Sequence, residues 1–116
     1  MIRALVLAAV LCAPARADGG AEGASVKLKD LEDCVATLAY FRDGLSAKTG
    51  ALDKEFNGRI PSAFSPLLAL KRNRIAKQQS ACARRGADVE RALAGLNDDA
   101  LRGRLNLSLK ALASLH

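Results

Sequence analysis

Residues 65–96, SPLLALKRNRIAKQQSACARRGADVERALAGL, carry the pattern that decides the fold. Hydrophobic side chains recur at every seventh position of this stretch, at Leu68, Ile75, Cys82, Val89 and Leu96. A row with this spacing follows one side of an α-helix and is typical of a long helix packed alongside another. Ser65 can cap such a helix, and Pro66 suits its first turn. The stretch therefore predicts one helix from Pro66 to about Leu96.

The segment before this stretch predicts a partner helix that starts at Val26, with Ser25 as its N-cap. Apolar residues spaced by three and four share one face of it, namely Leu31, Cys34, Leu38, Phe41 and Leu45. Glycine weakens a helix, so Gly44 and Gly50 leave two alternatives. The helix either runs on to about Phe56 or breaks between the two glycines and restarts.

A turn and a third helix complete the predicted fold. Residues 57–65 (NGRIPSAFS) contain an Asn-Gly pair followed by proline, which is typical of a turn between helices. Residues 97–99 (NDD) would cap a C-terminal helix whose apolar face comprises Leu101, Leu105, Leu112 and Leu115. We therefore predict an all-α fold: a long antiparallel helical hairpin with a coiled-coil-like seam and a third C-terminal helix. This three-helix bundle would become four helices if the first helix breaks.

The N-terminus, MIRALVLAAVLCAPARADGG, has the pattern of a secretory signal peptide. Arg3 precedes an apolar run of about ten residues, and small residues then precede a cleavage site between Ala17 and Asp18. The run is too short for a membrane-spanning helix, which needs about 20 residues. We therefore expect a signal peptide over 1–17, a flexible leader over 18–25 and one helical domain over 26–116. The mature protein would be periplasmic or secreted.

The cysteines agree with export. Cleavage would remove Cys12 and leave Cys34 and Cys82, and an even number of cysteines in an exported chain favours a disulfide. The alternative is a pair of buried free thiols. If the thiols were free, Arg84 and Arg85 beside Cys82 in the sequence would favour its thiolate.

The charge of the chain is basic and concentrated in one stretch. Without Arg3 and Arg16 the chain would keep 16 Lys and Arg against 12 Asp and Glu, a net charge of +4 instead of +6. Residues 71–85, KRNRIAKQQSACARR, hold six basic residues and no acidic one. A disulfide between Cys34 and Cys82 would set the register of the hairpin. It would place acidic residues of the first helix beside basic residues of the second, in the pairs Asp33–Arg84, Asp30–Arg85 and Asp43–Arg74.

These basic residues support two interpretations. In the first, the charge pairs only help to set the register, each contributing about 0 to 1 kcal/mol. In the second, basic residues without a partner in this register contact an anionic partner, with help from the third helix; these are Lys71, Arg72, Lys77, Arg102 and Arg104. Lipopolysaccharide, anionic lipid or an acidic protein would suit such a patch. Nucleic acid does not, because the stretch has no aromatic side chain for base stacking and the protein is expected to be exported.

The sequence contains no motif for catalysis, a metal or a cofactor. Its single histidine is His116, at the C-terminus, and two cysteines 48 positions apart lack the spacing of metal ligands. We therefore expect no enzyme activity, no cofactor and no metal site.

The remaining function is binding. We expect an exported, non-enzymatic helical protein that binds another protein, as an adaptor, inhibitor, chaperone or secretion accessory. The alternative is an electrostatic binder of anionic surfaces. Tyr40, Leu107 and Leu109 are candidate exposed contacts, and self-association could bury an unused apolar face. In size, helical layout and cysteine separation the chain resembles the small periplasmic acid-stress chaperones, a resemblance that assigns no role to any residue.

Overall fold

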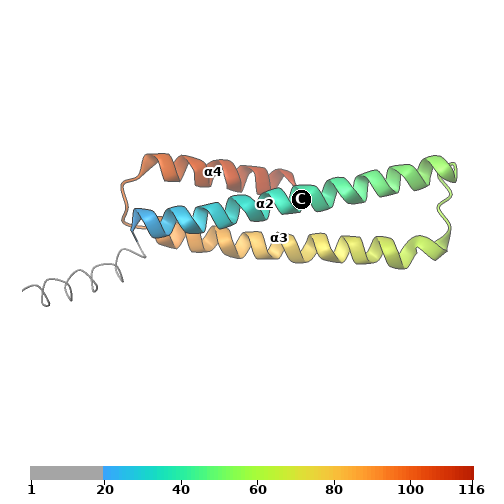
Figure 1. Cartoon of the computed structure of the whole chain (residues 1–116), viewed down its shortest axis with the longest axis horizontal. Helices are drawn as coiled ribbons and strands as arrows, with labels where there is room; N and C mark the ends of the chain where they lie inside the picture. Colours follow the sequence, from blue (N-terminus) through green and yellow to red (C-terminus); the bar gives the residue numbers. More distant parts are fainter. Residues whose placement is uncertain (1–19) are drawn as a thin grey trace, which may run out of the picture.

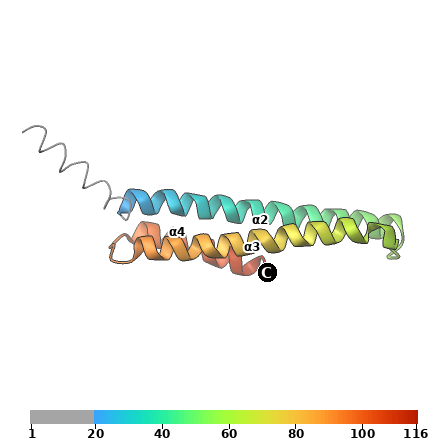
Figure 2. The same ribbon diagram turned by 90° about the horizontal axis from the view of Figure 1, so that it is seen from below.

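The computed structural model describes residues 20–116 and has the predicted all-α fold. Helix α2 (Ala21–Glu55) and helix α3 (Ser65–Leu93) form a long antiparallel hairpin, joined by a turn that includes the short 3₁₀ helix η1 (Ser62–Phe64). Helix α4 (Asp99–Ser114) packs against both of them (Figures 1 and 2). The predicted signal peptide and its cleavage site at Ala17–Asp18 lie outside the described residues. Within residues 20–116, no helix combines the length and apolar character that crossing a bilayer requires.

The heptad row of α3 lies in the core, as predicted. Leu68, Ile75, Cys82 and Val89 are all buried, and they meet the apolar face of α2, where Leu31, Cys34 and Leu38 are buried. The predicted disulfide joins the two helices at Cys34 and Cys82, whose Cα atoms are 5.6 Å apart. The hairpin therefore has the register that the sequence predicted.

Helix α2 differs from the prediction in two ways. It is continuous through Gly44 and Gly50, so the bundle has three long helices among the described residues. It also begins at Ala21, with Gly20 rather than Ser25 at its N-cap, so the flexible leader predicted over 18–25 is wrong for its last five residues. Ala24 is fully buried in the core, and this packing favours the helical conformation of the first turns. The same argument explains the missing break, because contacts on both sides of the glycines outweigh a propensity cost of about 1 kcal/mol each.

The two connections use residues with left-handed backbone conformations. After α2, Asn57 and Gly58 have φ angles of 52° and 79°, as the predicted Asn-Gly turn requires. After α3, Gly95 has a φ of 81°, and the helix ends at Leu93, three residues before the predicted Leu96.

Helix α4 starts with the predicted cap. The Asp98 side chain accepts a hydrogen bond from the backbone N–H of Leu101 at 3.0 Å, which satisfies one of the free donors of the first turn. The core side of α4 carries Leu101, Leu105 and Leu112, all buried. It crosses α3 closely at Gly86, where a Cβ atom would lie 3.0 Å from Cδ2 of Leu109. Glycine at this position therefore permits the contact between the two helices.

We expect substitutions of Gly86 to be more harmful than the same change elsewhere in a helix. Gly103→Ala in α4 meets nothing within 4 Å and should stabilise the protein by up to about 1 kcal/mol through helix propensity. Gly86→Ala should gain less, because Leu109 must move, and Gly86→Leu should destabilise by about 1–3 kcal/mol. Urea unfolding of the three variants measures these changes. A Gly86→Leu variant as stable as the unmodified protein would contradict the close contact.

Helix α4 covers only part of the hairpin. Its C-terminal end lies near the middle of α2, so the half that contains the turn consists of two helices alone (Figure 1). The side chain of Gln79 donates a hydrogen bond to the carbonyl oxygen of Leu115 at 3.1 Å, which holds the end of α4 at this level of α3. We call the uncovered part, residues 44–76, the distal hairpin.

Candidate functional site

The distal hairpin carries most of the net charge of the described chain. It holds six Lys and Arg against two Asp and Glu, a net charge of +4. The rest of residues 20–116 holds ten Lys and Arg against nine Asp and Glu, a net charge of +1. Three of the six basic residues of 71–85 belong to this region, namely Lys71, Arg72 and Arg74, and the end of α2 and the turn supply the other three.

Among residues 20–116, no ion pair includes a basic side chain of the distal hairpin. The ion pairs among residues 20–116 are Lys29–Asp33 within α2, Asp88–Arg91 within α3 and Glu32–Arg104 between α2 and α4. All three lie in the half of the molecule that α4 covers. Unpaired charge on a two-helix segment is available to an anionic partner at little cost in stability.

The pairs predicted between α2 and α3 are not formed, although the register is correct. Asp33 binds Lys29 on its own helix at 2.9 Å instead of Arg84. Arg74 does not bind Asp43 but lies over the ring of Phe41, with 5.5 Å from its Cζ atom to the ring centre. A cation over an aromatic face is a favourable contact that needs no carboxylate. Asp30 and Arg85 line the same pocket, as the register predicted, but no ion pair joins them. The role of these charges in setting the register stays a prediction.

The residues predicted to contact an anionic partner do not form a single patch. Lys71 and Arg74 line the same pocket. Arg72 is the next residue after Lys71, so its side chain points about 100° away from that of Lys71 around α3. Lys77 is exposed and lies about 200° from the buried Ile75, on the opposite side of α3. Arg102 and Arg104 belong to α4, and both contact other groups of the protein.

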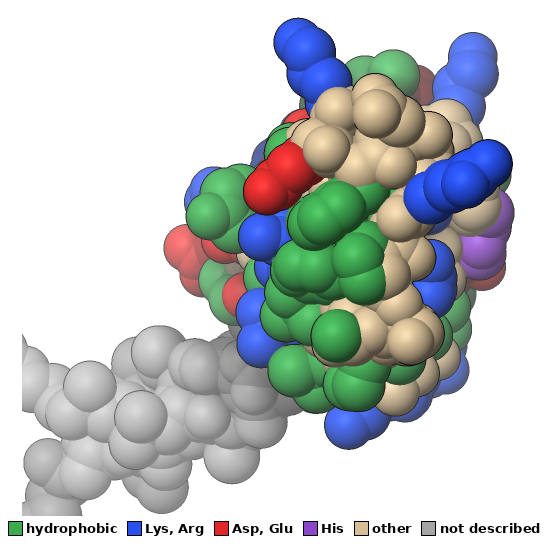
Figure 3. All heavy atoms as spheres, turned by 90° about the vertical axis from the view of Figure 1, so that its right-hand side faces the viewer, with side chains coloured by type: hydrophobic (Ala, Val, Ile, Leu, Met, Phe, Trp, Pro, Cys, Tyr) green, Lys and Arg blue, Asp and Glu red, His purple; other side chains and the backbone are tan. Residues whose placement is uncertain are grey.

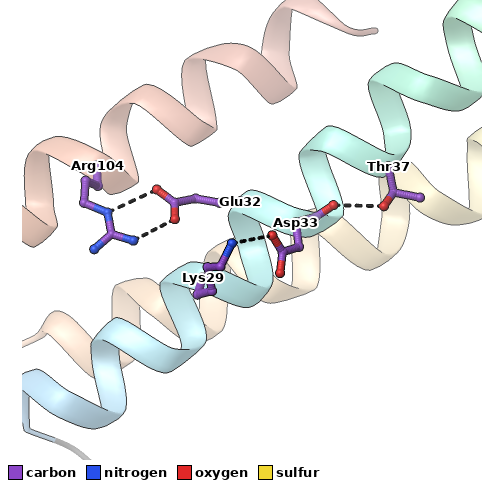
Figure 4. Close-up of polar contacts among 5 residues, drawn as sticks. All are labelled: Lys29, Glu32, Asp33, Thr37 and Arg104. Atoms are coloured by element: carbon purple, nitrogen blue, oxygen red, sulfur yellow. Dashed lines mark hydrogen bonds and ion pairs between the residues drawn. The ribbon is translucent and has the colours of Figure 1, made fainter.

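Arg102 and Arg104 hold α4 in place. The Arg102 side chain donates a hydrogen bond to the carbonyl oxygen of Leu93, at 3.4 Å. Arg104 makes a two-point contact with Glu32, with Nη2 at 2.7 Å from Oε1 and Nε at 3.1 Å from Oε2 (Figure 4). Both arginines therefore have hydrogen-bond partners within the protein.

The contact with Arg104 makes the stability of the protein depend on the charge of Glu32. Its hydrogen bonds hold the pKa of the Glu32 carboxyl below the ordinary value, against the opposing effect of partial burial. Because this pKa is lowered in the folded state, the contact between Glu32 and Arg104 contributes its full stabilisation above the ordinary carboxyl pKa. That stabilisation is lost as the pH falls through the lowered pKa.

We therefore expect Glu32→Gln to reduce stability at about pH 7 and to have a smaller effect as the pH falls below about 4. Urea midpoints over this pH range measure the difference from the unmodified protein. Glu90→Gln is the control, because Glu90 is exposed on α3 and makes none of the ion pairs above. A difference that stays constant with pH would contradict the role of the Glu32 charge.

A pocket lined by both aromatic and basic residues lies at the edge of the distal hairpin and extends beyond residues 44–76. Tyr40, Phe41 and Gly44 of α2 line it together with Lys71 and Arg74 of α3. The ring centres of Tyr40 and Phe41 are 6.2 Å apart, and Tyr40 is 75% exposed, as predicted. The pocket combines positive charge with accessible aromatic surface, so it suits a partner that is both acidic and apolar.

A second hollow begins where α4 ends. Leu115 at the C-cap of α4, Leu45 of α2 and Ile75 of α3 line it. The other lining residues belong to α2 and are the charged Arg42 and Asp43 and the small Ser46, Thr49 and Gly50. Small side chains let another backbone approach closely. The hollow therefore continues the line of α4 along the seam between α2 and α3.

The turn end of the hairpin exposes apolar side chains among basic ones. Figure 3 shows hydrophobic side chains gathered on this end, with Lys and Arg side chains around them. Leu67 and Leu70 at the start of α3 are 38% and 59% exposed. The sequence analysis missed both, although their positions off the heptad row were a signal for exposure. It correctly placed Leu107 at the surface, but Leu109 is partly buried against the core.

Comparisons with protein-family models, with curated proteins and with solved structures find no match to this chain. In the described part, no three His, Cys, Asp or Glu side chains are grouped as a metal ion would require. The net charge of the distal hairpin and the pockets beside it therefore make it the candidate site.

Proposed function

We propose that this protein is an exported, non-enzymatic binding module whose distal hairpin docks an acidic segment of another protein. The observation that carries the proposal is the contrast between the two halves of the hairpin. One half is covered by α4 and contains every ion pair named above, and the other has a net charge of +4 without one. Export is supported by the signal-peptide pattern of residues 1–17 and by the disulfide, which persists in oxidising compartments.

The uncovered seam suits a helix as the docked segment. An amphipathic helix binds a groove through apolar side chains spaced by three and four residues. The hollow beyond Leu115 would receive that apolar face in line with α4. Acidic residues on its flanks would meet the unpaired basic side chains at the edges of α2 and α3. Charge complementarity of this kind mainly increases the rate and the specificity of association.

Site-specific crosslinking in the native host tests the proposal. A photoreactive residue at Leu70, in the distal hairpin, should crosslink to another protein. The same residue at Leu107 on α4 is the control, because Leu107 is just as accessible but lies away from the distal hairpin, with exposures of 70% against 59% for Leu70. Equal crosslinking at both positions, or none at Leu70, would count against this site.

A charge-reversal experiment identifies the electrostatic contribution. Lys71→Glu together with Arg74→Glu should abolish the crosslink at Leu70. Lys110→Glu, an exposed charge on α4, should leave it unchanged. A crosslink that survives the double reversal would show that the partner does not bind through these charges.

An anionic membrane surface is the second candidate, and the turn end of the molecule favours it. Exposed apolar side chains surrounded by basic ones, as in Figure 3, are typical of segments that bind anionic lipid at the interface. Sedimentation with phosphatidylglycerol vesicles, and with phosphatidylcholine vesicles as the control, separates this candidate from a protein partner. Binding to the anionic vesicles should fall steeply with salt, and its absence at low salt would eliminate the candidate.

A further inference from the structure

The two sulfur atoms of the disulfide have different surroundings. Cys34 lines an open pocket on the side of the hairpin, between α2 and α3. The other residues of the pocket are Asp30, Asp33, Thr37, Gln78 and Arg85. Cys82, in contrast, is completely buried, with an exposed fraction of 0%. Cys34 is itself buried, with an exposed fraction of 5%, but it lines the pocket, so its sulfur is the easier of the two for a reagent to approach.

Two side chains beside Cys34 favour a negative charge on its sulfur, whereas the carboxylates of Asp30 and Asp33 in the same pocket oppose it. Nη1 of Arg85 lies 3.1 Å from the Sγ atom of Cys34, and Nε2 of Gln78 lies 3.2 Å from the same atom. Gln78 is held in place because its amide also donates to the backbone carbonyl of Cys34, at 3.1 Å. A cation and an amide donor directed at one sulfur stabilise its thiolate, the form that reacts in thiol chemistry.

This arrangement reverses what the sequence suggested. Arg84 and Arg85 lie next to Cys82 in the chain, and from the sequence they were expected to favour the thiolate of that cysteine. In the structure, Arg85 instead reaches across the hairpin to Cys34. Among the described residues, no hydrogen bond reaches the sulfur of Cys82.

We propose that Cys34 is the thiol through which this protein undergoes thiol–disulfide exchange, with Cys82 as the resolving thiol. In the reduced protein, the Cys34 thiolate attacks one sulfur of an external disulfide, forms a mixed disulfide and releases one external thiolate. Cys82 then loses its proton and attacks the Sγ atom of Cys34, which releases the second external thiolate. Two protein thiols are oxidised and one external disulfide is reduced to two thiols, so atoms and electrons balance.

The same asymmetry affects how the bond is reduced. In reduction, an external thiolate attacks Cys34, because Cys34 is the sulfur that lines the pocket. The leaving group is then the thiolate of Cys82, which has no hydrogen-bond donor among the described residues, and a poorly stabilised leaving thiolate slows the exchange. Reduction of the bond between α2 and α3 should therefore be slow.

Two single variants test which cysteine reacts. We expect Cys82→Ser, treated with oxidised glutathione, to gain one glutathione at Cys34 at least about tenfold faster than Cys34→Ser gains one at Cys82. Mass spectrometry of quenched samples measures both rates, and circular dichroism reports whether the helices are intact. In the reduced unmodified protein, the first mixed disulfide should appear at Cys34. Equal rates, or a first adduct at Cys82, would overturn the proposal.

Substitution of the donor tests why Cys34 reacts. In the Cys82→Ser protein, Arg85→Ala should lower the rate of alkylation at about pH 7 by about tenfold and move the midpoint of the pH–rate profile upward. Arg85→Lys should restore part of the rate, because it keeps the charge. The control is Arg84→Ala, which removes the neighbouring exposed arginine and should change neither quantity. If the helices melt once the disulfide is absent, Arg85→Ala and Arg84→Ala will behave alike, and that result would also contradict the proposal.

Discussion

Replacing both Cys34 and Cys82 with alanine should lower the free energy of unfolding by about 4 kcal/mol, because the bond closes a loop of about 49 residues. The open chain gains conformational entropy when it unfolds, and the cross-link removes much of that gain. A small domain has a total stability of about 5–15 kcal/mol, so the loss would bring this protein close to unfolding. Urea unfolding, followed by circular dichroism, measures the change.

The unmodified protein in a thiol reductant provides the control. Its stability should fall to that of the double variant, and the reductant should not affect the double variant itself. A loss below about 1 kcal/mol would show that the unfolded chain is already restricted without the bond. Agreement between reduction and mutation would assign the loss to the cross-link rather than to the packing of the two sulfur atoms.

The parts of the fold that the sequence predicted are those that depend on a periodic pattern. The spacing by sevens from Leu68 to Val89 predicted the buried side of α3 because only that spacing keeps one face of a helix against a neighbour. The cap at Asp98 was equally predictable, since its side chain acts within its own turn. The disulfide was predicted from the even number of cysteines that the expected cleavage would leave.

The parts that it did not predict depend on contacts between distant segments. The continuity of α2 through Gly44 and Gly50 is decided by packing, which local propensity does not contain. The partner of Glu32 is 72 positions away on α4, so the pattern of charges in one helix could not reveal it. From the sequence, acidic side chains of α2 were instead paired with basic side chains of α3. In the structure, Arg74 of α3 contacts the aromatic ring of Phe41.

The basic composition of the candidate site was predictable from the sequence, but its position in the fold was not. The basic residues of 71–85 could be counted in the sequence, whereas the point at which α4 ends along the hairpin depends on how it packs. The three ion pairs among residues 20–116, including that of Arg104, lie on one side of that endpoint, and Lys71 lies on the other. The candidate site is the part of the hairpin that α4 leaves uncovered. Its position can therefore be found only from the tertiary structure.

Leu105→Ala should lower the free energy of unfolding by about 3 kcal/mol, whereas Leu107→Ala should change it by less than about 0.5 kcal/mol. Both leucines belong to α4 and lose the same atoms, but Leu105 is 1% exposed and Leu107 is 70% exposed. Only Leu105 leaves a cavity between α4 and the hairpin, so the difference between the two variants isolates the packing of α4. Urea unfolding at two protein concentrations measures it.

The result for Leu107 also bears on self-association. A cost for Leu107→Ala as large as that for Leu105→Ala, growing with protein concentration, would mean that a second copy covers Leu107 in solution. A small cost that does not depend on concentration would leave the outer face of α4 in water. Leu105 and its buried neighbours, together with the polar contacts of Arg102 and Arg104, would then hold the third helix at the level where the distal hairpin begins.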